Sequence, residues 1–263
     1  MKKRIHAAVI FLTTLTAISV TLAAFIYNGY FHINGRTAKK YSIRGVDVSH
    51  YQGDIDWQIL SGEDIHFAYI KATEGSSHTD EKFAYNYAES QKTELKIGAY
   101  HFFSFDSPGI SQAEHFIRTV NPFKGMLPPA VDVEFYGDKK KNPPKAEDVE
   151  TELRAYLNQV EQAFGTKPVI YATMEAWELY IRGRFDEYPL WIRNILREPV
   201  LQPATEGGQE KNWTFWQYTD RGRLNGYSGE ETFIDLNVFC GSEEEWQQGF
   251  FIQMRKGEQN GNT

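Results

Sequence analysis

The stretch Ala130–Phe135 reads AVDVEF, and it places two acidic side chains within an otherwise apolar strand. Successive side chains of a strand point to opposite faces, so residues two positions apart share a face. Val131 and Val133 therefore line one face, whereas Asp132 and Glu134 line the other. Two prolines precede the run and a glycine soon follows it, which keeps the strand short. The stretch thus predicts a strand with a pair of carboxylates on one face.

Short apolar runs recur on both sides of this strand, and helical patterns separate most of them. In the stretch 146–165, for example, Leu153, Leu157 and Val160 form an apolar stripe and Gly165 ends the helix. This alternation is typical of a parallel sheet with helical crossovers. The last two strands are joined by a short glycine-containing stretch with little room for a helix. We therefore expect an α/β barrel that is (β/α) at first and plain β at its end. Besides the opening strand, the predicted strands are 45–50, 66–73, 96–105, 167–173, 188–194, 213–219 and 232–239.

The first 27 residues predict an export signal. Three basic residues at positions 2–4 precede an uncharged, mostly apolar run from Ala7 to Tyr27. The run has about the 20 residues that a membrane-spanning helix needs, and basic residues before such a helix stay in the cytoplasm. We interpret it as an uncleaved signal anchor or a cleaved signal peptide, and both move the rest of the chain out of the cytoplasm. Residues 28–42 are expected to be a linker, 43–250 one domain and 251–263 a C-terminal tail.

Charge also divides the chain near its start. Residues 1–44 contain seven basic residues and no acid, which leaves 21 basic against 35 acidic residues in the remainder. A domain this acidic is unsuited to nucleic acid or anionic lipid, because phosphates are bound by basic patches. Cys240 is the only cysteine, so an intrachain disulfide is impossible. The sequence shows no Cys/His cluster of the kind that binds zinc, and we expect neither a metal nor a cofactor.

Three further acids occupy the ends of other predicted strands. They are Asp47 in GVDVSHYQG, Glu74 after YIKAT and Asp235 in FIDLN. Active sites of parallel barrels lie at the C-terminal ends of the strands, so we expect these acids to converge with the pair on AVDVEF. Each also has a structural interpretation: Asp47 could cap a loop, Glu74 could pair with Lys71, and Asp235 could pair with a buried arginine. The pair on AVDVEF is more specific, because two like charges on one strand face repel each other.

Such a carboxylate pair suits glycoside cleavage. One carboxylic acid protonates the leaving oxygen, while the other group stabilises the positive charge that develops on the sugar. Positions two apart on a strand have Cβ atoms roughly 6–7 Å apart. This spacing is compatible with a direct nucleophile, with inversion and with attack by the sugar's own acetamido oxygen. The spacing alone does not choose among the three routes.

Eight motifs resemble, in order, the glycoside hydrolase family 25 lysozymes, which are the Chalaropsis-type muramidases. The resemblance covers residues 43–240, and several motifs in order are more specific than any single one. It implies an irregular TIM-like (β/α)5(β)3 barrel. It also implies hydrolysis of the β-1,4 bond between N-acetylmuramic acid and N-acetylglucosamine in peptidoglycan. The motifs are RGVDVSHYQGDIDW, YIKATEG, GAYHFF, PAVDVEF, KPVIYAT, PLWI, WTFWQYT and FIDLNVF.

The resemblance also implies roles for single residues. Glu134 would be the proton donor, and Asp132 its partner, either as the nucleophile or by orienting the acetamide. Asp47 would complete the acidic floor. Aromatic faces can stack on sugar rings while polar tips bind hydroxyl groups. The expected substrate-binding residues are Glu74, Tyr100, His101, Phe102, Tyr171, Trp191, Trp216, Gln217, Tyr218 and Asp235.

The sequence therefore favours an exported, monomeric enzyme that acts on peptidoglycan glycan strands and contacts the membrane only through its N-terminal segment. A hydrolase of chitin-like N-acetylglucosamine polymers remains an alternative, and digestion of chitin against peptidoglycan separates the two. A non-catalytic wall-binding barrel is a second alternative, and such a protein would tolerate Glu134→Gln. A metal-dependent deacetylase is disfavoured, because no ligand cluster accompanies the acids.

Overall fold

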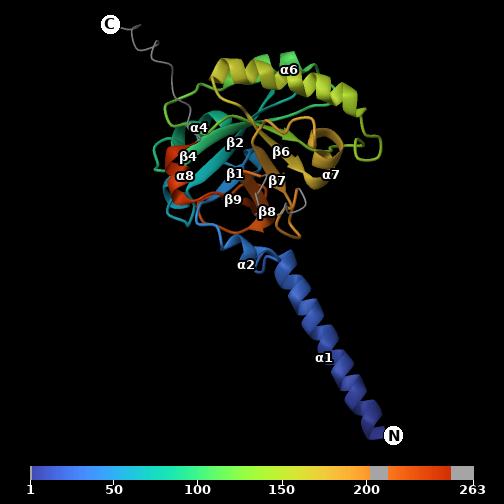
Figure 1. Cartoon of the computed structure of the whole chain (residues 1–263). Helices are drawn as coiled ribbons and strands as arrows, with labels where there is room; N and C mark the ends of the chain where they lie inside the picture. The colour runs from blue at the N-terminus through green and yellow to red at the C-terminus, as the bar shows by residue number, and fades with distance from the viewer. Residues whose placement is uncertain (1, 202–212, 250–263) are drawn as a thin grey trace.

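The computed structural model describes residues 2–201 and 213–249, and Figure 1 shows a barrel from which one long helix projects. The expected C-terminal tail at 251–263 lies outside the described residues, as does most of the connection between the strands predicted at 188–194 and 213–219. Every predicted strand lies within the described residues, so the order of the strands in the barrel can be compared with the prediction.

Eight strands close into the barrel in the order β1-β9-β8-β7-β6-β5-β4-β2, and a β1–β2 pairing completes the ring. Neighbouring strands are parallel except at β9, which is antiparallel to both β1 and β8. The two-residue strand β3, which the sequence pattern does not predict, pairs with β2 outside the ring. The strands are β1 (Arg44–Val48), β2 (Phe67–Glu74), β3 (His78–Thr79), β4 (Lys96–Phe102), β5 (Ala130–Val133), β6 (Val169–Thr173), β7 (Leu190–Arg193), β8 (Phe215–Gly222) and β9 (Ile234–Phe239).

Helices follow each of the first five parallel strands, as the predicted alternation requires. The longest, α6, lies across the top of the molecule in Figure 1 and packs against α5. The expected mixed α/β barrel with an N-terminal apolar helix is thereby confirmed. The helices are α1 (Lys2–Tyr27), α2 (Gly35–Ala38), α3 (Trp57–Leu60), α4 (Phe83–Ser90), α5 (Gly109–Thr119), α6 (Ala146–Phe164), α7 (Met174–Ala176) and α8 (Glu243–Gln248), with a 3-10 turn at His50–Gln52 and a π-helical turn at Trp177–Ile181.

The two faces of the strands pack against different surroundings. One face, which includes Val131 and Val133, packs against the surrounding helices in a large apolar core. The other face fills the inside of the barrel with aromatic rings such as Phe67, Tyr69 and Phe215. Gly98 on β4 makes room for this filling, because a Cβ at that position would lie 2.3 Å from the ring of Tyr69. The interior is therefore closed by apolar side chains below the level of the acids.

The N-terminal segment has two parts that differ in packing. None of the side chains of α1 is buried, and α1 is long and apolar enough to cross a membrane by length and composition. Residues 28–42, which we expect to be a linker, are instead folded against the barrel. Ala38 and Tyr41 are almost fully buried there, and the ring of Tyr41 contacts Trp213 and Trp216. The part of the chain that packs with the barrel therefore starts before residue 43.

Candidate active site

The acids meet at the C-terminal ends of the parallel strands. Asp47 on β1, Asp132 on β5, Glu134 just after β5 and Asp235 on β9 all line one cavity of about 240 Å³. β1 and β9 pair so that Asp47 lies directly opposite Asp235. Four of the five predicted acids are therefore brought together, and they form the floor and wall of a single site.

Asp47 is held at the floor by hydrogen bonds from two buried amides. Gln217 Nε2 donates to both carboxyl oxygens of Asp47, at 3.3 and 3.0 Å, and Asn237 Nδ2 donates at 2.7 Å. Each amide is fixed in turn, because Tyr171 Oη donates to Gln217 Oε1 at 3.0 Å and Trp191 Nε1 donates to Asn237 Oδ1 at 2.8 Å. Burial raises the pKa of Asp47, although these hydrogen bonds oppose the rise. This network locks the floor of the site.

Asp132 is the acid whose burial is least offset by hydrogen bonds. Its Oδ1 atom is buried and has no hydrogen-bond partner among the described residues. Burial and the nearby Glu134 carboxylate raise the pKa of Asp132 well above its usual range, while the ammonium group of Lys71 opposes the rise. A buried polar atom without a partner is costly, so an oxygen left in this state is available to a group that enters the cavity.

Glu134 has an environment that favours the protonated form. Burial raises its pKa, Arg193 opposes the rise, and the charge of Asp47 adds to it. The guanidinium of Arg193 is itself held by Asp220, with Nη2 and Oδ2 2.6 Å apart. A carboxyl group that keeps its proton at higher pH than usual is suited to donate that proton.

A second, more open groove of about 820 Å³ continues from this cavity. Glu134, Tyr171, Gln217 and Asp235 line both spaces, so they stand where the groove meets the acids. The groove is lined by residues from the loops after β5, β7 and β8 and from α7. Its further lining residues include Phe135, Lys140, Arg193, Leu196, Asp220, Arg221 and Phe233.

The expected substrate-binding residues divide by strand face. The inner cavity is lined by Tyr100, Phe102, Tyr171, Trp191 and Gln217, all of which project into the barrel. Glu74 is not among the lining residues, and its carboxylate accepts a hydrogen bond from Lys71 Nζ at 2.7 Å. The structure therefore shows the pairing with Lys71 that the sequence left open for Glu74.

Three expected contacts lie on the outer face of their strands. His101 is fully buried, its two ring nitrogens lie within 3.0 Å of Thr73 and Gln112, and its ring stacks on Tyr156. Trp216 and Tyr218 belong to the apolar core around the barrel. Their placement does not support the expected contact with substrate, because alternate residues of β4 and β8 point away from the cavity.

Three lining or supporting residues are not among those that the sequence predicts for the site. Lys71, Arg193 and Asn237 each lie two positions from an inward-facing residue on the same strand, namely Tyr69, Trp191 and Asp235. Strand alternation was the signal that could have found them. Within residues 2–201 and 213–249, no group of three His, Cys, Asp or Glu side chains is arranged to hold a metal ion.

Paired carboxyl groups at the mouth of an α/β barrel, opening into an elongated groove, define a barrel glycoside hydrolase. The model of the glycosyl hydrolases family 25 matches residues 46–227. A family 25 glycosyl hydrolase structure from Bacillus anthracis superimposes with a TM-score of 0.73, at 51% identity, over 80% of this chain and 94% of that one. The protein YegX of Escherichia coli O157:H7 is 37% identical over 212 residues, which is 79% of this chain and 73% of YegX. Lysozyme M1 of Streptomyces globisporus is 32% identical over 214 residues, covering 76% of this chain and 68% of that protein. The chain belongs to the glycosyl hydrolases of family 25.

Proposed function

We propose that the chain is a lysozyme that cleaves the β-1,4 bond between N-acetylmuramic acid and N-acetylglucosamine in peptidoglycan. The observation that carries this proposal is the pair of raised-pKa carboxyl groups, Asp132 and Glu134, in one cavity that opens into the groove. Membership of the family supports it, as does the similarity to a protein named as a lysozyme. Peptidoglycan glycan strands are the proposed substrate, and no cofactor takes part.

Glu134 is the proposed general acid. Its carboxyl group lies where the cavity meets the groove, so a glycosidic oxygen bound across that junction is within its reach. Protonation of that oxygen lets the bond to the anomeric carbon break, and positive charge develops on the sugar. Burial raises the pKa of Glu134, so its carboxyl group holds a proton to higher pH than an ordinary glutamate, which suits it to act as an acid catalyst.

Asp132 is the proposed partner of the general acid. Its unpartnered Oδ1 atom can accept a hydrogen bond from the acetamide N–H of a bound sugar, which turns the acetamido oxygen toward the anomeric carbon. The same carboxylate can instead face the anomeric carbon directly. Asp47 fixes the floor beneath both groups and adds negative charge that favours a developing cation.

The proposed location is outside the cytoplasm, with α1 retained as a membrane anchor. The three basic residues before the apolar run set its orientation, and none of the side chains of α1 is buried against the barrel. The enzyme is proposed to act as a monomer.

The decisive experiment compares wild type with Glu134→Gln as detergent-solubilised full chains acting on purified peptidoglycan. New reducing ends are counted, and mass spectrometry identifies the sugar that carries each one. We expect muramic acid ends from wild type and a loss of about 10³-fold or more in the variant, because the general acid is gone. Release of N-acetylglucosamine ends would overturn the bond assignment. Equal activity of the two proteins would remove Glu134 from its role.

A further inference from the structure

The chain between α1 and the barrel forms a packed joint, which we define as residues 27–34. The backbone N–H groups of Gly29 and Tyr30 donate to the carbonyl oxygens of Ile26 and Phe25, at 3.1 and 2.9 Å, and end the helix. Gly29 adopts a φ of +70°, and a Cβ there would lie 2.3 Å from the carbonyl oxygen of Arg221 on β8. Both the backbone conformation and the close approach require glycine at this position. The end of the helix is therefore fitted to the barrel.

Arg221 on β8 and Arg223, just after that strand, hold the carbonyl groups of the last residue of α1 and of the residue that follows it. Arg221 Nη1 donates to the carbonyl oxygen of Tyr27 at 2.6 Å, and Arg223 Nε donates to that of Asn28 at 2.7 Å. The last carbonyls of a helix lack partners within it and carry partial negative charge. The final turn of α1 has no basic residue of its own, so the barrel supplies both cations.

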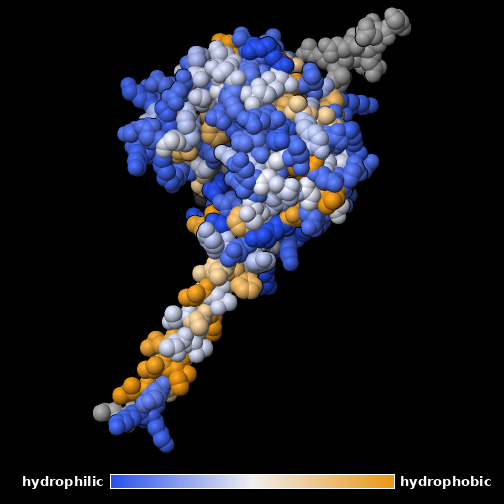
Figure 2. Space-filling model, turned by 180° about the vertical axis from the view of Figure 1, so that it is seen from behind, coloured by the Kyte–Doolittle hydropathy of each residue, from blue (hydrophilic) through white to orange (hydrophobic). Residues whose placement is uncertain are grey.

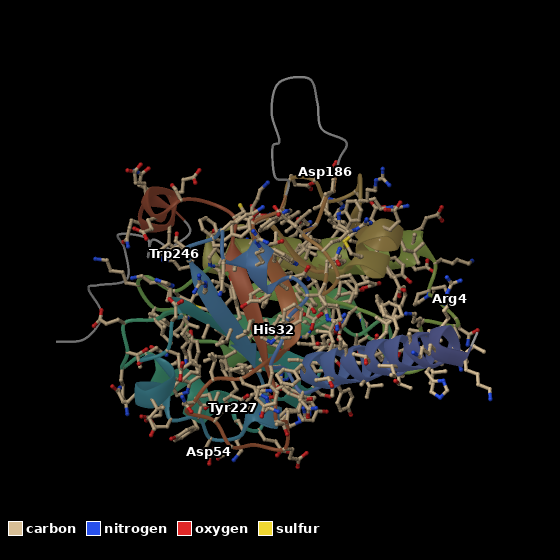
Figure 3. The ribbon with its side chains drawn as sticks, turned by 90° about the horizontal axis from the view of Figure 1, so that it is seen from below. Arg4, His32, Asp54, Asp186, Tyr227 and Trp246 are labelled. Carbon is tan, nitrogen blue, oxygen red and sulfur yellow. The ribbon has the colours of Figure 1, made fainter. Side chains whose placement is uncertain are left out.

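A second attachment is made by His32 and Asn34. Asn34 is almost fully buried, and its Nδ2 group donates to the carbonyl oxygens of Asn194 and Tyr218, both at 3.2 Å. His32 Nε2 lies 3.0 Å from the carbonyl oxygen of Arg221. Figure 3 shows His32 where α1 meets the barrel. Two separate attachments fix the direction in which α1 leaves the domain.

The joint lies at the end of the barrel that carries the groove. Arg221 and Phe233 line the groove, and the guanidinium of Arg221 also lies 4.7 Å from the ring centre of Tyr27. The opposite end of the barrel, at the N-terminal ends of the parallel strands, is marked by Lys92 and Trp246. Figure 3 shows Trp246 away from His32 and α1. A residue of the groove wall, Arg221, thus contacts the end of the apolar helix directly.

The exposed surface of the joint has the chemistry of a membrane interface. Tyr27, Tyr30, Phe31 and Ile33 each expose about half or more of their surface. Tyrosine is enriched at the level of the lipid headgroups, where its ring meets apolar chains and its hydroxyl meets water. Figure 2 shows hydrophobic colouring along α1 that reaches the base of the domain. The uncharged, mostly apolar run of 21 residues from Ala7 to Tyr27 spans about 31 Å as a helix, close to the hydrocarbon thickness of a bilayer.

We propose that the joint docks the catalytic domain on the outer surface of the membrane, with the groove beside the lipid headgroups and the opposite end of the barrel pointing away. This inference rests on the proposal that α1 is retained as the anchor. An enzyme held in this way acts on the glycan strands that lie next to the membrane. A flexible tether would instead let the groove sample the wall at many heights.

The test measures the height of two positions above a bilayer. Full chains carrying Cys240→Ser and either Leu196→Cys, on the groove rim, or Lys92→Cys, at the opposite end, are reconstituted in phosphatidylglycerol and phosphatidylethanolamine vesicles. A membrane-impermeant donor dye then labels outward-facing domains, and the lipid headgroups carry the acceptor. We expect clearly higher energy transfer from position 196 than from position 92. Leu196 is 69% exposed, so the label fits there without repacking.

Gly29→Val should separate the joint from the barrel, because the added side-chain atoms would clash with the carbonyl oxygen of Arg221. We expect the difference between positions 196 and 92 to shrink, while hydrolysis of soluble glycan fragments is unchanged. Asn34→Ala, which removes the second attachment, should act in the same direction. Energy transfer could be equal from positions 196 and 92 in otherwise native chains that are inserted and active. That result would overturn the docking but not the proposed function. Failure to enter vesicles would overturn anchor and docking together, and inactivity with unequal transfer would count against the proposed function alone.

Discussion

Charged neighbours of Glu134 act on its pKa in opposite directions. Burial has the largest effect and raises the pKa, Arg193 and Lys71 lower it, and Asp47 raises it. Because the general acid works only while protonated, activity is lost as pH rises through this raised pKa. Asp47→Asn removes the neighbouring negative charge, so the alkaline limb of the pH–rate profile should move to lower pH. Arg193→Gln should move it to higher pH. Profiles of kcat that shift in the same direction for both variants would contradict this electrostatic account.

Asp132 illustrates the cost of keeping an acid inside the barrel. Its pKa in the folded protein is raised, so protonation stabilises the fold below the unfolded-state pKa, and that stability is lost as pH rises through the folded-state pKa. Asp132→Asn carries no charge at any pH. The variant should therefore be more stable than wild type by about 1 kcal/mol near neutral pH, with the advantage shrinking in acid. Thermal unfolding across the acid and neutral range measures the difference, and a variant less stable at every pH would show that the carboxylate is not strained.

Strand β8 carries two neighbouring residues with opposite surroundings, which makes it a matched test. Gln217 points into the barrel and donates to Asp47, whereas Trp216 points outward and donates to the carbonyl oxygen of Asn194 at 2.9 Å. We expect Gln217→Ala to lower kcat roughly tenfold, because a hydrogen bond to the acidic floor is lost. Trp216→Phe should cost about 1–2 kcal/mol of stability while activity stays within about twofold. Kinetics and thermal unfolding of the two variants test this division. A larger loss of kcat in Trp216→Phe than in Gln217→Ala would contradict it.

The same alternation explains how much of the site the sequence could predict. The acids were identifiable because charge in an apolar strand stands out, and four of them do converge. The resemblance implies substrate contacts for three consecutive residues of GAYHFF and three of WTFWQYT, although only every second residue of a strand can face the groove. His101 was included for that reason. The pairing of Glu74 with Lys71 was one of the predicted alternatives, but the periodicity of β2 could not choose it. A register shift in β2 between Lys71 and Thr73 precedes Glu74, and strand periodicity cannot be followed through such a shift.

At the scale of the whole molecule, the closed barrel followed from the rhythm of strands and helices, but the path of residues 28–42 did not. That segment has neither helical nor strand periodicity, and its contacts are single side chains inserted between elements far away in the sequence. Asn34 reaches β8, and the hydroxyl of Tyr41 donates to Glu198. Contacts of this kind form only between segments that the tertiary fold brings together, so a local sequence pattern does not predict them.

This packing predicts that a chain beginning at residue 43 is less stable than one beginning at residue 28. The shorter chain loses the buried side chains of Ala38 and Tyr41 and uncovers Trp213 and Trp216. Loss of one large buried aromatic side chain costs about 3–5 kcal/mol, so the melting temperature should fall by several degrees. Tyr41→Ala in the longer chain should reproduce most of the loss, while Tyr41→Phe, which keeps the ring, should retain most of the stability. Equal melting temperatures for the two chains would mean that residues 28–42 are a tether after all, and the docking of the groove at the membrane would fall with them.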